Sequence, residues 1–205
     1  MPMKTLVQVY HATKPRGFSL IELLVVISII ALLIGILLPT LPGVINTARQ
    51  TACSAQLRGI GQGIELYKND NTDVFPIAKY MPDPWLSGSD SPSLNVALTQ
   101  YIEPDSDGYE CPGDKIVFPF EYTAENGQVV NCGSSYTYIT GLGGRRIEES
   151  WFVERLQFNP SQVPVLNDYD GGTFETQDGQ FVQVDFFHGQ RMFYFADGSA
   201  GQIRD

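Results

Sequence analysis

Histidine is the side chain most often used for acid–base chemistry near neutral pH, and this chain of 205 residues has two of them, His11 and His188. Eight residues separate His188 from Asp197, a pair that could orient a general base. However, the sequence marks no nucleophile and contains no His-Glu-x-x-His, Gly-x-Ser-x-Gly or Cys-x-x-Cys motif. We therefore interpret His188 as a strand-edge histidine that hydrogen-bonds to backbone, and we expect no enzyme activity.

A second group of side chains suits a hard cation. Asp168 and Asp170 lie within the segment NDYDGG, residues 167–172, and further acids follow at Glu175 and Asp178. Calcium takes about six to eight oxygen ligands, which loop carboxylates and carbonyls can supply. The run lacks the spaced glutamate of an EF-hand, and an acidic, solvated loop is the alternative. Asp168 and Asp170 are candidate calcium ligands, and the sequence requires no other cofactor.

The third distinctive residue is Glu22, a carboxylate inside an apolar run. Residues 18–38 carry no other charge, and about 20 apolar residues cross the roughly 30 Å hydrocarbon core of a bilayer. A charge at the centre of a membrane helix costs about 2.5–3.5 kcal/mol on insertion scales. Because Glu22 lies near the end of the run, its cost is smaller. It could reach for lipid headgroups, or it could have a partner inside a protein assembly.

Basic residues are placed asymmetrically around this run. Lys4, Lys14 and Arg16 precede it without any acid, and Arg49 is the first basic residue after it. The positive-inside rule therefore predicts a cytoplasmic N-terminus and an exported C-terminal domain. The run is too long for an ordinary secretory signal, and no small-residue cleavage site follows it. We expect it to remain as a single-pass anchor in the lipid bilayer.

The start of the run has a specific pattern, KPRGFSLIELLVV at residues 14–26. It closely resembles the N-terminal signature of type IV pilins and type II secretion pseudopilins. The resemblance implies that a prepilin peptidase cuts between Gly17 and Phe18, that Phe18 becomes N-methylated, and that the helix stays in the bacterial inner membrane with a periplasmic head. It also implies that Glu22 pairs with the amine of Phe18 in a neighbouring subunit, which sets the axial step of a filament.

A second likeness covers the C-terminal part of the chain. It is similar to a large group of prepilin-like proteins that end in a His, a spacer and Asp-Gly. The matching features are Cys111-Pro112, Ser135-Tyr136 and the run from His188 to Asp197-Gly198. The group has a nine-residue spacer where this chain has eight. Major pseudopilins also carry a calcium-stabilised loop, which supports the candidate ligands Asp168 and Asp170.

Three cysteines, Cys53, Cys111 and Cys132, are present. Cys111 and Cys132 both lie in the presumed exported domain, where disulfides persist. A bridge between them would close a loop of about 20 residues, worth about 3 kcal/mol in the chain-entropy model. Spacing alone does not fix the pairing, so two free thiols remain the alternative to a Cys111–Cys132 disulfide.

Beyond the membrane run, the pattern predicts an amphipathic helix over residues 39–69 that Pro39 and Pro42 bend or interrupt. A helix that stops at the membrane surface is the alternative. The expected apolar stripe recurs at three- and four-residue steps and comprises Ile45, Ala48, Ala52, Ala55, Gly59, Ile60, Ile64 and Tyr67. This stripe should pack on the head.

Residues 70–205 alternate short apolar patterns with Pro, Gly and Asp, as expected of an extracytoplasmic head domain. Strands are predicted at 135–140, 163–166, 181–187, 192–196 and 200–203, and short helices at 94–102 and 146–156. Asp197-Gly198 is a hairpin signal between the last two strands. The predicted fold class is α+β and pilin-like, with a leader (1–17), a transmembrane helix (18–38), its continuation (39–69) and an antiparallel β-sheet head (70–205).

The charge balance is acidic, 13 Lys and Arg against 23 Asp and Glu, which argues against nucleic-acid binding. The resemblance implies a structural subunit of a type II secretion-like pseudopilus or a type IV pilus-like filament. The implied partners are prepilin peptidase, other pilin or pseudopilin subunits, an inner-membrane assembly platform and lipid. The alternative is a membrane-tethered binding protein that uses the signal for export and does not polymerise.

Overall fold

The computed structural model describes residues 18–82, 85, 88, 90–115, 117, 120–123, 127–169 and 171–203. The chain forms two compact units, residues 1–43 and residues 44–205. In the first unit, helix α1 spans Leu20–Leu37, and none of its residues is buried. Proline at position 39 has no backbone N–H to continue the hydrogen-bond ladder, so the regular helix stops there.

Helix α2 spans Leu41–Asp70. Pro42 lies in its first turn, where backbone N–H groups have no partner within the helix, so the proline is tolerated. At the other end the chain leaves the helix through Thr72 and Asp73, both with positive φ. Lys68 is buried in the last turn, where its Nζ lies 3.0 Å from Glu65 Oε2 and 4.8 Å from the Phe75 ring centroid.

The buried face of α2 differs from the predicted stripe. Ile60 and Ile64 are buried as expected, but Ile45, Ala48, Ala55 and Gly59 are exposed, so the prediction is wrong for these four positions. The buried residues are Cys53, Leu57, Ile60, Gly61, Gly63, Ile64 and Lys68. Leu57, Ile60 and Ile64 face the core, where they remove more surface from water than the exposed Ala48 and Ala55 would.

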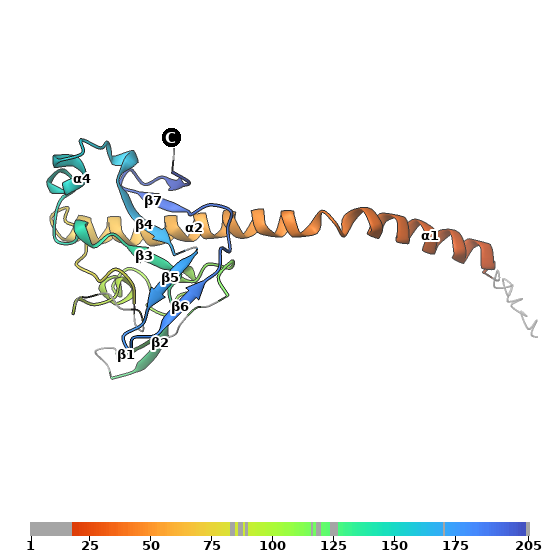
Figure 1. The fold of residues 1–205 in the computed structure, drawn as a ribbon, viewed down its shortest axis with the longest axis horizontal. Helices are drawn as coiled ribbons and strands as arrows, with labels where there is room; N and C mark the ends of the chain where they lie inside the picture. Colours follow the sequence, from red (N-terminus) through yellow and green to blue (C-terminus); the bar gives the residue numbers. More distant parts are fainter. Residues whose placement is uncertain are drawn as a thin grey trace, which may run out of the picture. The chain divides into compact units, whose positions relative to one another are not determined.

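The head contains a four-stranded antiparallel sheet in the order β3-β4-β7-β8. Its strands are β3 (Tyr136–Tyr138), β4 (Pro164–Asp168), β7 (Phe193–Phe195) and β8 (Ala200–Gly201). Two separate hairpins pair β1 (Phe120–Thr123) with β2 (Val129–Cys132), and β5 (Gly172–Glu175) with β6 (Phe181–Val184). Figure 1 shows β3, β4 and β7 beside α2. The α+β fold class is therefore confirmed.

Two buried clusters hold the head together. In the larger one, α2 places Leu57, Ile60 and Ile64 against sheet residues such as Tyr138 and Leu166. The smaller one, beside the β5–β6 hairpin, consists of Met81, Trp85, Tyr169 and Val184. The larger cluster packs helix α2 against the sheet. The smaller cluster packs the β5–β6 hairpin, which follows β4, against the rest of the head.

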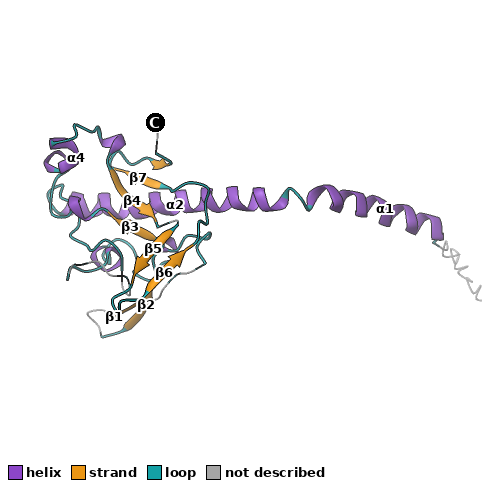
Figure 2. Cartoon of the chain, viewed as in Figure 1, coloured by secondary structure: helices purple, strands orange, loops and turns teal. Residues whose placement is uncertain are grey.

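Several short elements depart from the sequence-based expectation (Figure 2). The helix expected at 94–102 is limited to α3, Leu94–Ala97. The one expected at 146–156 divides into the 3-10 turn η3, Ile147–Glu149, and α4, Trp151–Glu154, because Ser150 between them is extended. Three further 3-10 turns are η1 (Asp107–Tyr109), η2 (Thr140–Leu142) and η4 (Pro160–Gln162).

The hairpin predicted at Asp197-Gly198 is present between β7 and β8. Gly198 has φ +85°, a conformation that costs glycine little, and Asp197 Oδ1 accepts the Ser199 N–H at 2.9 Å. The aspartate therefore serves the turn itself, in keeping with its local sequence signal.

Helix α2 approaches strand β7 closely at Gly61, and the stability of the head should depend on this contact. A Cβ at position 61 would overlap the ring of Tyr194, whereas one at position 59 would meet no atom within 4 Å. Gly61→Ala must displace the ring, so we expect it to lower the free energy of unfolding by about 1–3 kcal/mol. Gly59→Ala should raise it by up to about 1 kcal/mol through helix propensity. Chemical unfolding of the full chain in detergent compares the two, and equal stabilities would contradict the close contact.

Candidate functional site

The N-terminal end of α1 carries the residues of the processing and assembly prediction. Glu22 lies in the first turn, and its Oε2 accepts the backbone N–H of Ser19 at 2.9 Å. A carboxylate is favourable there because it satisfies a free N–H and faces the positive end of the helix dipole. Phe18 is 73% exposed, so it is accessible from outside the helix. Gly17 lies outside the described residues.

The rest of α1 is apolar on every side. Its large side chains range from 46% exposed at Val26 to 86% at Leu20, so no stripe of the helix is set apart as polar. It is long and apolar enough to cross a membrane, about 27 Å at 1.5 Å per residue. A helix with this surface needs lipid or other apolar helices around it.

In the head, the structure brings together residues that the sequence analysis kept apart. His188 is buried at 5% exposure, with Nδ1 3.0 Å from Asp168 Oδ2 and Nε2 3.5 Å from Cys111 Sγ. The interpretation of His188 as a strand-edge histidine bonded to backbone is therefore wrong. Its carboxylate partner is also Asp168 and not Asp197, because β4 ends facing the segment that carries the histidine.

The disulfide joins Cys53 to Cys111, with Cα atoms 5.1 Å apart. The predicted Cys111–Cys132 pairing is therefore wrong. Cys132 is a buried free thiol, held away at the end of β2, where it pairs in register with Phe120. A signal for the correct partner does exist in the sequence. Cys53 precedes Leu57 by four residues, so it shares the helix face that packs on the head.

The structure also places Asp168, one of the two candidate calcium ligands. It is fully buried in β4, and its Oδ1 accepts the Met192 N–H at 3.1 Å. Asp170 lies outside the described residues, so calcium binding at this pair stays a prediction. Asp178 is fully exposed in the β5–β6 turn, and a hydrogen bond from the Thr176 hydroxyl lowers the pKa of its carboxyl.

A hydrogen-bond network holds the Cys111 segment against the sheet. Ser135 Oγ accepts the Cys111 N–H at 3.0 Å and donates to Asp114 Oδ2 at 2.8 Å. The Tyr169 hydroxyl donates to the same carboxylate oxygen. Burial, reinforced by this carboxylate, raises the pKa of Tyr169 above its usual range, so the phenol stays protonated. The network positions Cys111 next to His188.

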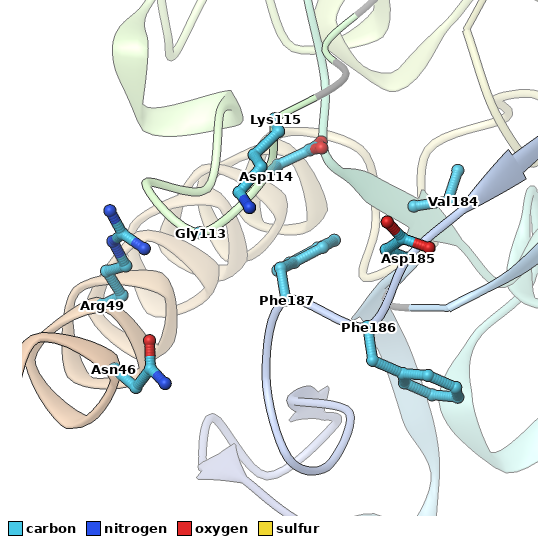
Figure 3. Close-up of a pocket in the computed structure, with 9 residues that line it drawn as sticks. All are labelled: Asn46, Arg49, Gly113, Asp114, Lys115, Val184, Asp185, Phe186 and Phe187. Carbon is cyan, nitrogen blue, oxygen red and sulfur yellow. The ribbon is translucent and has the colours of Figure 1, made fainter. Parts of the chain in front are cut away.

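A pocket of about 270 Å³ lies beside this cluster. Figure 3 shows Asn46 and Arg49 of α2 on one side, residues 184–187 at the end of β6 on the other, and residues 113–115 between them. Two cations, Arg49 and Lys115, and two carboxylates line it, so it is polar and nearly balanced in charge. Among the described lining residues there is no serine, cysteine or histidine that could act as a nucleophile or base.

Comparison with known proteins supports the prediction for the N-terminal helix. Residues 13–38 match the family described as the prokaryotic N-terminal methylation motif. Over 56 residues, 27% of this chain, the sequence is 43% identical to PilA4, the type IV wide pilus major component of Thermus thermophilus. The match spans 43% of the length of that protein. No solved structure matches the chain.

These matches agree with the geometry. The methylation motif covers the whole of α1, including the glutamate in its first turn. The long apolar helix followed by an antiparallel head is consistent with a pilin-like architecture. The family model describes a methylation motif, and the relative is named as a pilus component. The N-terminal segment of this chain is therefore prepilin-like.

Proposed function

We propose that the mature chain is a structural subunit of a filament of the type IV pilus or type II pseudopilus kind. The observation that carries the proposal is α1, which is apolar on every side except for a carboxylate in its first turn. Lipid can cover such a helix before assembly, and identical helices can cover it afterwards. A bundle of these helices would form the filament core, with the heads on its surface.

Cleavage of the leader creates the positive charge that would pair with Glu22 of a neighbouring subunit in the filament. Cleavage between Gly17 and Phe18 leaves a cationic amine four residues before Glu22. In the free chain the Glu22 carboxylate holds the Ser19 N–H, which leaves acceptor capacity for a second donor. A neighbouring subunit's amine would bind there in a medium with little screening. Buried ion pairs contribute little net stability, but they specify register well.

The surrounding machinery follows from this proposal. Prepilin peptidase and an inner-membrane assembly platform would act on the cytoplasmic side, with the head in the periplasm as the basic leader indicates. We propose no enzymatic role, because the His188–Asp168 pair lies in the core next to a disulfide. The pilus name of the relative supports a filament, and a pseudopilus would use the same helix in the same way.

The mature N-terminus provides the first test. We expect mass spectrometry of the chain purified from membranes to find N-methylated phenylalanine at position 18, because the resemblance to prepilins implies a cut after Gly17. An intact Met1 would indicate an uncleaved signal anchor. A start beyond Leu38 would indicate a soluble exported protein, and either result would overturn the proposal. Replacing Gly17 with glutamate should leave the leader attached, while Gly35→Ala, which meets no atom within 4 Å, should be processed normally.

A further inference from the structure

The buried residues Cys53, Cys111 and His188 form what we call the Cys–Cys–His cluster. Their sulfur and nitrogen atoms all lie within 4.8 Å of one another. We infer that this cluster binds a thiophilic divalent metal ion such as zinc when its two cysteines are in the reduced form. Two thiolates and one imidazole are a ligand set that zinc prefers, with the fourth tetrahedral position open to a water molecule.

The distances within the cluster suit a tetrahedral ion. Zinc bonds of about 2.3 Å to sulfur and about 2.0–2.1 Å to nitrogen place the two ligand atoms about 3.6 Å apart. The distance between Cys111 Sγ and His188 Nε2 is 3.5 Å. The two sulfurs would need about 3.8 Å on the same ion, a separation that side-chain rotation can provide once the disulfide is open. The three ligand atoms therefore start close to the separations that one ion requires.

The histidine is already oriented as a ligand. Its Nδ1 faces Asp168 Oδ2 at 3.0 Å, so the carboxylate favours the proton on Nδ1 and directs the Nε2 lone pair toward the sulfurs. Asp168 is itself fixed, because its Oδ1 accepts the Met192 N–H. Metal-binding histidines are usually held by a carboxylate or carbonyl on the second nitrogen in this manner. Asp168 is thus a positioning residue for the metal ligand.

The surroundings of the two cysteines also favour their binding a metal ion as thiolates. Cys111 Sγ accepts the Gly113 N–H at 3.4 Å, a contact that stabilises negative charge on sulfur. Cys53 and Cys111 are 0% and 2% exposed, so water competes poorly for an ion between them. Two thiolates neutralise the charge of the divalent ion, so the ion and its two sulfur ligands together carry no net charge.

The pocket in Figure 3 adjoins the cluster at Gly113. Gly113 lines that pocket, and a Cβ at this position would lie 3.1 Å from His188 Nε2 and 3.0 Å from the Phe187 ring. Because Gly113 has no side chain, only its backbone separates the pocket from His188 Nε2 at this point.

Metal binding and the disulfide are alternative states of the same sulfurs. Binding takes two protons from the thiols, forms two S–Zn bonds and one N–Zn bond, and transfers no electrons. A low-molecular-weight disulfide can then oxidise the two thiolates to the Cys53–Cys111 bridge, and it is itself reduced to two thiolates. Two of the three metal ligands are lost, so the ion is released. The dithiol form exists first, because a new chain starts in a reducing compartment.

Cobalt is the direct probe of this inference. We expect Co²⁺ added to the full chain, in detergent with a phosphine reductant, to produce a thiolate-to-cobalt charge-transfer band and tetrahedral d–d bands. Zinc should displace the cobalt with one equivalent. Oxidised glutathione should abolish the bands and restore the disulfide. A reduced chain that stays colourless, or an oxidised chain that binds equally well, would contradict the inference.

Matched variants assign the ligands. Cys53→Ser and His188→Gln should each weaken Co²⁺ binding by at least about 100-fold, whereas Cys132→Ser should bind normally although its thiol is also buried. Asp168→Asn should weaken binding by about 10–100-fold, the usual effect of losing such a partner. Circular dichroism checks folding, and His188→Gln must still form the disulfide when oxidised. Loss of the bands in Cys132→Ser would overturn the assignment. None of these results depends on whether the chain forms filaments.

Discussion

Replacing Glu22 with alanine is expected to abolish filament assembly while the precursor is still inserted and cleaved. The carboxylate is the one charge of the predicted span, and its partner would be the Phe18 amine of a neighbouring subunit. Removing one member of a buried pair leaves the other charge uncompensated, at a cost of about 3–5 kcal/mol per contact. Since about 1.4 kcal/mol is a factor of ten, sheared filaments should fall by more than about 100-fold.

The matched control is Ser28→Ala, which also removes a polar group from α1. Ser28 Oγ bonds to Leu24 O within its own helix, so its loss should leave filaments unchanged. Glu22→Gln keeps the size of the side chain and can still bond to the Ser19 N–H, and we expect it to fail like alanine because the charge is missing. Filaments are quantified by immunoblot of the sheared fraction and precursor cleavage by mass spectrometry. Normal filaments from Glu22→Ala would favour a tethered protein that does not polymerise.

The elements that were predictable from sequence are those with a strong local signal. Helix α1 follows from an apolar run, and the β7–β8 hairpin from Asp197-Gly198. Strands β1 and β2 were not predicted, because short strands of mixed polarity such as VVNC at residues 129–132 carry no clear alternation. The helices at 94–102 and 146–156 were predicted too long, since a few apolar residues at helical spacing do not exclude 3-10 turns.

The cluster around His188 was not predictable because it is assembled from distant parts of the chain. Asp168 and His188 are 20 residues apart, and Cys111 precedes His188 by 77. No motif spacing links them. Asp168 also lies within a run of polar residues that suggested a solvated loop, yet its backbone belongs to β4 and its side chain points into the core. Pairing of β4 with β7 decides that burial, and such register depends on the whole sheet.

Removing the Cys53–Cys111 disulfide should have the largest effect on the stability of the head. The bridge closes a loop with a sequence separation of 58, far longer than the loop between Cys111 and Cys132. In the chain-entropy model a loop of this length contributes about 4 kcal/mol, with measured values of about 2–5 kcal/mol. Cys53→Ala should therefore lower the free energy of unfolding by about that amount, measured by chemical unfolding of the full chain in detergent. Non-reducing peptide mapping identifies the bridge directly.

Cys132→Ala separates the crosslink from the loss of a buried sulfur. Both cysteines are almost fully buried, so each alanine variant loses similar packing, about 1 kcal/mol for one small group. The remaining difference between the two variants is the crosslink. Adding a reductant without metal should bring the wild-type chain down to within about 1 kcal/mol of Cys53→Ala, since the reduced chain keeps its buried sulfur, and should leave that variant unchanged. If peptide mapping of the wild-type chain instead joins Cys111 to Cys132, the assignment of the bridge to helix α2 is wrong.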